Sequence, residues 1–123
     1  MSWIVESGGR IIWQPGRTLG QFFVEQLSAL EHLVELPSGI TSPLADELQV
    51  DARQLERFLT AVMDMLSKSN NGALLTLARG VTQVALALHA EATGDWLPVP
   101  ERLSLLGAQA REVLRARAIS DPV

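Results

Sequence analysis

The longest apolar stretch of the chain spans residues 73–93 and reads ALLTLARGVTQVALALHAEAT. Asn70, Asn71 and Gly72 precede this stretch and Gly94 follows it, a pattern typical of the two ends of a helix. At about 100° per residue, the stretch predicts a single broad core-facing stripe. The members of that stripe are Leu74, Leu77, Ala78, Val81, Val84, Ala85, Leu88 and Ala92. The remaining polar strip is narrow, so we expect this helix to be packed on more than one side, by its own chain or by a partner.

Length and composition favour one globular domain, because the chain has 123 residues of which 47% are hydrophobic and 20% are charged. The net charge of -4 argues against a nucleic-acid-binding surface, which needs clustered Lys and Arg. Without cysteine there is no disulfide and no thiol chemistry. The N-terminus lacks the pattern of a signal peptide, and Arg79 and Glu91 argue against a membrane-spanning helix. We therefore expect a cytoplasmic protein that binds neither nucleic acid nor membrane, and its many arginines suggest a bacterial source.

Two short apolar segments near the N-terminus, residues 3–5 and 11–13, predict a β-hairpin over residues 3–13. Gly8 and Gly9 between them supply the positive φ angles of a tight turn. With these two glycines as the loop, the facing pairs are Ser7 with Arg10, Val5 with Ile12, and Ile4 with Trp13. Both faces of such a hairpin are apolar, and an isolated hairpin is marginal in water. The hairpin either covers the helices as a lid or pairs with another copy or a partner.

Further helices are predicted over about 19–36, 52–67 and 101–118 from their apolar periodicity. Thr18 and Gln21 match a capping box that opens the first of them. The second helix has the clearest start in the chain, with Asp51 as N-cap and Gln54 three residues later. The core face of the first helix is expected to consist of Leu19, Phe22, Phe23, Leu27, Leu30, Leu33 and Val34.

The segment between the first two of these helices, residues 37–50, is long for a helix-to-helix connection. Its apolar residues argue against disorder, so we expect an ordered loop with a short helical turn near residues 44–48. The whole chain is thus predicted to be mainly α: a four-helix bundle-like domain with an N-terminal β-hairpin, forming a single domain over residues 1–123.

The sequence contains no recognisable catalytic motif, since it lacks a nucleophile elbow, a phosphate-binding loop and a dinucleotide fingerprint. His32 and His89 each lack a Glu three residues earlier, so the Glu-x-x-His metal pattern of helical bundles is absent. We therefore predict no catalytic residue, no metal site and no cofactor.

Two sets of residues are candidates for binding. The first is an apolar interface set, because aromatic residues on the hairpin and apolar residues on the flank of the central helix suit a protein partner. This interface set consists of Trp3, Ile4, Trp13, Leu75 and Leu86. The second set would line a pocket between the central helix and the long loop, with Arg79, Gln83 and His89 as its polar groups. Alternatively, Arg79 pairs with Asp64 and His89 donates to a loop carbonyl.

Three segments resemble a family of small, uncharacterised actinobacterial proteins. They are residues 3–15, WIVESGGRIIWQP; residues 36–40, LPSGI; and residues 46–51, DELQVD. The resemblance covers about the first two thirds of the chain and implies no activity and no functional residue. The leading hypothesis is a non-enzymatic protein–protein interaction module that self-associates as a homodimer, or an accessory or antitoxin/immunity-like protein with an unidentified partner. The alternative is a small-molecule binder or minor enzyme with an apolar pocket beside the central helix.

Overall fold

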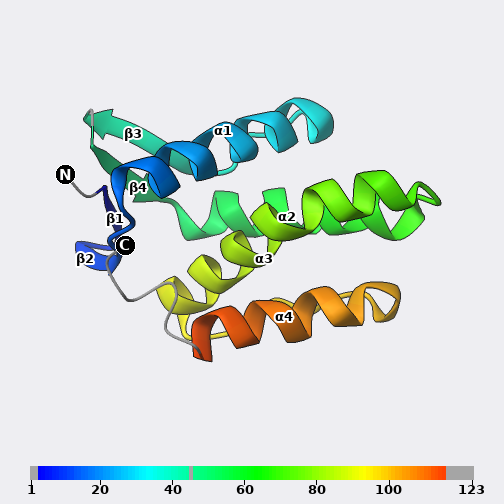
Figure 1. Ribbon diagram of the computed structural model, residues 1–123. Helices are drawn as coiled ribbons and strands as arrows, with labels where there is room; N and C mark the ends of the chain where they lie inside the picture. The colour runs from blue at the N-terminus through cyan, green and yellow to red at the C-terminus, as the bar shows by residue number, and fades with distance from the viewer. Residues whose placement is uncertain (1–2, 45, 116–123) are drawn as a thin grey trace.

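The computed structural model describes residues 3–44 and 46–115 and is mainly helical, as predicted (Figure 1). A small sheet lies at one end, and the helices extend from it in the order α1, α2, α3, α4 from top to bottom of the view. The strands are β1 (Ile4–Ser7), β2 (Arg10–Trp13), β3 (Ile40–Leu44) and β4 (Glu47–Val50). The helices are α1 (Arg17–Val34), α2 (Ala52–Lys68), α3 (Gly72–Thr93) and α4 (Ser104–Arg115), with a 3₁₀ turn over Glu101–Leu103. The predicted continuation of α4 over 116–118 lies outside the described residues.

The predicted hairpin is one half of a four-stranded mixed sheet with the strand order β2-β1-β4-β3. β1 and β4 run parallel, with Val5 opposite Leu48, whereas β3 and β4 form a second antiparallel hairpin. The prediction of a loop with a helical turn over 37–50 is therefore wrong. The alternating burial of Leu48 and Val50 around exposed Gln49 is the period of a strand. Pro43 fits β3 because an edge strand tolerates a residue without a backbone N–H.

The turn of the first hairpin is as predicted, but its register is not. Gly8 and Gly9 have φ angles of 58° and 79°, and Ser7 faces Arg10. The register holds for Glu6 with Ile11 and then shifts, so that Val5 faces Trp13 instead of Ile12. The extra residue on β2 is a β-bulge, and it allows the consecutive residues Ile12 and Trp13 both to be buried.

Helix boundaries follow the capping signals with one exception. The Asp51 carboxylate accepts hydrogen bonds from the N–H groups of Arg53 and Gln54, both at 3.1 Å, as its predicted N-cap role requires. Gly94 is the C-cap of α3 and has a φ angle of 82°, in the left-handed region, as predicted. The capping box at Thr18 is not used, because α1 begins two residues earlier than predicted, at Arg17, with Gly16 as its N-cap.

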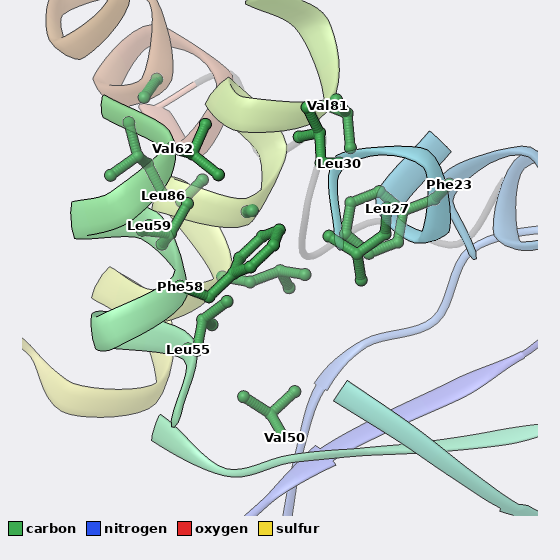
Figure 2. Packing of buried hydrophobic residues seen from close by; sticks show 14 of the residues in the cluster. Phe23, Leu27, Leu30, Val50, Leu55, Phe58, Leu59, Val62, Val81 and Leu86 are labelled. Atoms are coloured by element: carbon green, nitrogen blue, oxygen red, sulfur yellow. The ribbon is translucent and has the colours of Figure 1, made fainter. Parts of the chain in front are cut away.

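The core is built mostly by α1, α2 and α3. Figure 2 shows Phe58 of α2 pointing toward Phe23 and Leu27 of α1, with Val50 of β4 below them. α3 contacts α1, α2, α4 and β2, so the expectation that it is packed on several sides is confirmed. Most of the predicted stripe is covered, since Ala78, Val81, Ala85 and Leu88 are buried, but two residues of α3 depart from the prediction. Leu77 is 77% exposed although it was expected in the core, and Leu86 is 1% exposed although it was expected on a flank.

α3 is also long and apolar enough, by length and composition, to cross a bilayer. Core helices of globular domains pass the same test, and half of its most apolar window is buried inside the structure. Its contacts with three other helices favour the core interpretation.

Candidate functional site

Three of the five predicted interface residues belong to the core. Trp3, Trp13 and Leu86 are 9%, 3% and 1% exposed, whereas Ile4 and Leu75 are half-buried. The indole of Trp3 lies against Gly20 of α1, and Leu86 lies beside Leu59 and Val62 of α2 (Figure 2). The ring of Trp13 lies edge-on to Phe23, with 5.4 Å between the ring centroids. As a correction to the sequence-based assignment, these three side chains present little surface to a partner.

The predicted pocket residues are divided between two grooves. Arg79 and Gln83 line an open groove of about 540 Å³ on the outer side of α3 and α4. In that groove the Gln83 side-chain amide donates to the side-chain oxygen of Gln109. Arg79 is exposed, and its expected partner Asp64 instead contacts Lys68 at 3.1 Å. This groove is shallow and carries no buried polar group of the predicted set.

His89 lines a second groove, of about 300 Å³, together with Arg53 and Glu56 of α2 and Trp96 of the connector after α3. Its imidazole is 5% exposed, and its Nδ1 atom is buried without a hydrogen-bond partner. Burial lowers the pKa of His89, while the nearby Glu56 carboxylate and the backbone of Asp95 act in the opposite direction. His89 is therefore a neutral buried imidazole at neutral pH, close to the loop carbonyl that the sequence alternative proposed.

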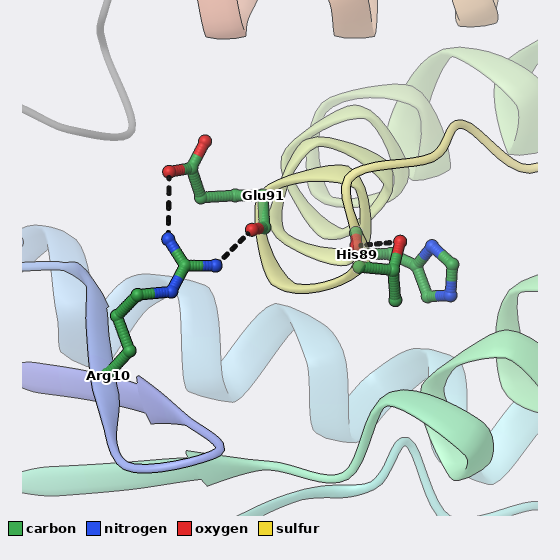
Figure 3. A network of polar contacts seen from close by, with 4 residues as sticks. Arg10, His89 and Glu91 are labelled. Carbon is green, nitrogen blue, oxygen red and sulfur yellow. Dashed lines mark hydrogen bonds and ion pairs between the residues drawn. The ribbon is translucent and has the colours of Figure 1, made fainter.

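The end of α3 is tied to the first hairpin by Arg10. Its Nη2 atom donates to the Glu91 backbone carbonyl at 2.6 Å, and its Nη1 atom lies 3.7 Å from the Glu91 carboxylate. The negative end of the helix dipole also stabilises a cation that lies beside the last carbonyls of a helix. Figure 3 shows this contact and the His89 imidazole on opposite sides of the end of α3. Arg10 thus has a structural role that is separate from the His89 groove.

Residues 3–44 and 46–115 include no group of three or more His, Asp or Glu side chains that could hold a metal ion. The sequence-based prediction of no metal site stays a prediction for the chain as a whole.

The most prominent surface feature is an apolar face of α1 that the sequence-based assignment placed in the core. Leu19, Phe22 and Leu33 are 36%, 58% and 55% exposed, and Leu36, just after the helix, is 38% exposed. We call these four residues the α1 outer face. The face of α1 that does pack inward consists of Gly20, Phe23, Leu27 and Leu30. A signal for this existed in the sequence, because α1 carries two apolar stripes that are offset by a single residue.

The two stripes differ in what covers them. Phe23 and Leu27 are covered by the sheet and by α2, as Figure 2 shows, whereas no described element covers Phe22 or Leu33. Large apolar groups exposed along a whole helix are typical of surfaces that bind another protein.

The fold and this surface define a class of protein: a small domain with four helices and a mixed four-stranded sheet, whose first helix is apolar on two faces. The chain belongs to a family of unknown function, DUF6086, whose model matches residues 1–119. No curated protein and no solved structure matches it.

Proposed function

We propose that this protein is a non-enzymatic protein–protein interaction module that self-associates through the α1 outer face. The single observation that carries the proposal is the exposure of Phe22 and Leu33, more than half of each side chain, on a helix whose neighbouring stripe is buried in the core. Burying a Leu or Phe side chain completely stabilises a complex by about 1.5–3 kcal/mol. Two copies that cover each other's outer faces gain several such contributions. Part of this gain is cancelled by the entropy lost on association.

The interface set predicted from the sequence is replaced in this proposal. Trp3, Trp13 and Leu86 stabilise the domain itself, so that the hairpin acts as part of the core. Leu19, Phe22, Leu33 and Leu36 take over the role of interface residues because they are the apolar groups left in contact with solvent on one helix.

Sedimentation velocity over micromolar to millimolar protein concentrations tests the proposal. The wild-type chain is expected to shift toward the mass of a dimer as concentration rises, and Phe22→Ser is expected to shift much less. Leu77→Ser is the matched control, because Leu77 is even more exposed but lies on α3. A wild-type chain that stays monomeric at millimolar concentration would overturn the proposal.

A second candidate function, binding of a small molecule, is supported by the groove at His89. A buried imidazole with an unpartnered nitrogen beside Glu56, Arg53 and Trp96 offers a few polar groups in a partly apolar setting, as small-ligand sites do. A thermal-shift screen with hydrophobic acids and common metabolites, run on the wild type and on His89→Ala, tests this candidate. Stabilisation of the wild type alone would support it, and no shift with any compound would count against it.

A further inference from the structure

The α1 outer face belongs to a longer stripe with the spacing of a coiled-coil seam. Successive members are separated by three and four residues in strict alternation, as in a heptad pattern. The members of this stripe inside the helix, here called the α1 seam, are Leu19, Phe22, Gln26, Ala29 and Leu33; Leu36 continues the spacing in the sequence but lies after the end of α1 at Val34. Ala29 is exposed and Gln26 is half-buried, so the centre of the seam is accessible as well as its ends. From Leu19 to Leu33 the seam is about 21 Å long.

We propose that two copies of the chain pair their α1 helices antiparallel, about a two-fold axis that crosses the seam between positions 27 and 28. This inference rests on the proposed function and specifies the partner and its orientation. In this arrangement Phe22 packs against Leu33 of the second copy, and Gln26 packs against Ala29 of the second copy. The seam is thus complementary to itself when reversed, as a two-fold interface requires.

Charge on the flank of the seam supports the antiparallel orientation. The row of α1 next to the seam, on the side away from the core, consists of Thr18, Glu25 and His32. All three are exposed. In the antiparallel pair this row meets itself reversed, so that Glu25 of each copy lies beside His32 of the other. The two-fold axis produces this pairing of a carboxylate acceptor with an imidazole N–H donor twice.

The parallel orientation lacks these advantages. It would place identical residues at the same level, with Phe22 beside Phe22 and the polar Gln26 beside Gln26. It would also put the two rows that carry Glu25 and His32 on opposite sides of the pair, where they do not meet. Antiparallel helices also align their dipoles favourably. The antiparallel pair alone places a small Ala29 opposite the longer Gln26.

Disulfide trapping tests the orientation directly, because the chain has no cysteine and any introduced thiol is therefore unique. Phe22→Cys and Leu33→Cys chains are purified separately, mixed and oxidised. A disulfide needs Cα atoms roughly 4.4–6.8 Å apart. In the proposed pair, positions 22 and 33 of opposite copies meet this condition, whereas the two copies of position 22 are separated by about 16 Å along the helix axis.

The mixture is therefore expected to give a covalent dimer, and each variant alone is expected to stay at the mass of one chain. Glu25→Cys with His32→Cys repeats the test while retaining every large apolar side chain of the seam. Leu77→Cys reports random collisions, since Leu77 is exposed on a different helix.

Two outcomes would overturn the antiparallel pair without touching the proposed function. One is a covalent dimer of Phe22→Cys with itself, which indicates a parallel pair. The other is the absence of any covalent dimer in both mixtures while the wild-type chain sediments as a dimer. A wild-type chain that sediments only as a monomer overturns the proposed function and this inference together.

Discussion

Phe22 and Phe23 are neighbours in α1, yet the first is 58% exposed and the second is 4% exposed. The Phe23 ring lies edge-on to Trp13 in the core, whereas Phe22 has no such cover. A helix turns by about 100° per residue, so one step along the chain carries a side chain from the core face to the surface. The pair marks the boundary between the stripe that stabilises the domain and the stripe that is free to bind.

This relationship predicts opposite consequences for two similar substitutions. Phe23→Ala should lower the free energy of unfolding by about 3–5 kcal/mol, because it removes a buried ring and leaves a cavity. Phe22→Ala should change it by less than about 1 kcal/mol at dilute concentration, because its ring is mostly in solvent. Chemical denaturation of both variants checks the prediction. Equal losses of stability would contradict the assignment of the two stripes.

The close approach of Trp3 to Gly20 predicts that a single methyl group added at Gly20 lowers the free energy of unfolding. A Cβ atom placed on Gly20 would lie 2.6 Å from Cγ and Cδ1 of the indole. Gly20→Ala should therefore be destabilising by about 1–3 kcal/mol through overpacking, despite the better helix propensity of alanine. Gly80→Ala is the control, since a Cβ there meets nothing within 4 Å. Gly80→Ala should raise the free energy of unfolding by about 0.5–1 kcal/mol. Urea titration of both variants measures the two free energies.

His89 predicts a specific pH dependence of stability. Burial places its pKa in the folded chain below the ordinary value of 6.5. Below pH 6.5 the unfolded chain therefore binds a proton that the folded chain does not, and stability falls as the pH is lowered toward the folded pKa. The free energy of unfolding, measured at several pH values in this window, should fall less steeply for His89→Gln than for the wild type. Equal slopes would show that the imidazole is not held neutral by the fold.

The flank of the α1 seam predicts a charge-swap effect on self-association. Glu25→Lys should weaken the dimer because it removes the carboxylate that would accept a hydrogen bond from the His32 imidazole of the second copy. A hydrogen bond contributes a net stabilisation of about 0.5–1.5 kcal/mol, so the two symmetric contacts give an effect on the order of tenfold in Kd. Combining Glu25→Lys with His32→Glu should restore much of the affinity, measured by sedimentation equilibrium.

Glu25→Lys also removes a hydrogen bond within α1, because Glu25 accepts one from Gln21. Circular dichroism of the variant shows whether the loss of this bond lowers the helix content. Unchanged helicity with weakened association assigns the effect to the interface. Failure of the double variant to recover would count against the proposed Glu25–His32 proximity.

The features that could be predicted from the sequence are those set by local chemistry. Gly8-Gly9 specifies a tight turn, Asp51 specifies a helix start, and Gly94 specifies a helix end, because each acts on its own backbone neighbours. The parallel pairing of Val5 with Leu48 joins segments far apart in the chain. No local pattern encodes that pairing, so the sheet that joins the two hairpins was missed.

The candidate surface was missed for a different physical reason. α1 carries more apolar residues than its core face can bury, and periodicity alone assigned Leu19, Phe22 and Leu33 to a single stripe with Phe23 and Leu27. Which part of that wide stripe is covered depends on where the sheet and α2 pack. The opposite error was made for the tryptophans. Their aromatic side chains favoured an interface in the sequence-based prediction, but Trp3 and Trp13 are buried against α1.

Sedimentation equilibrium of three chains tests self-association through the α1 outer face. The wild type and Leu77→Ser are predicted to share one dimer dissociation constant, and Leu33→Ser is predicted to raise that constant by about tenfold or more, since two copies each lose an apolar contact. The same constant for all three chains, or a wild type that remains monomeric throughout, would show that the α1 outer face does not pair two copies.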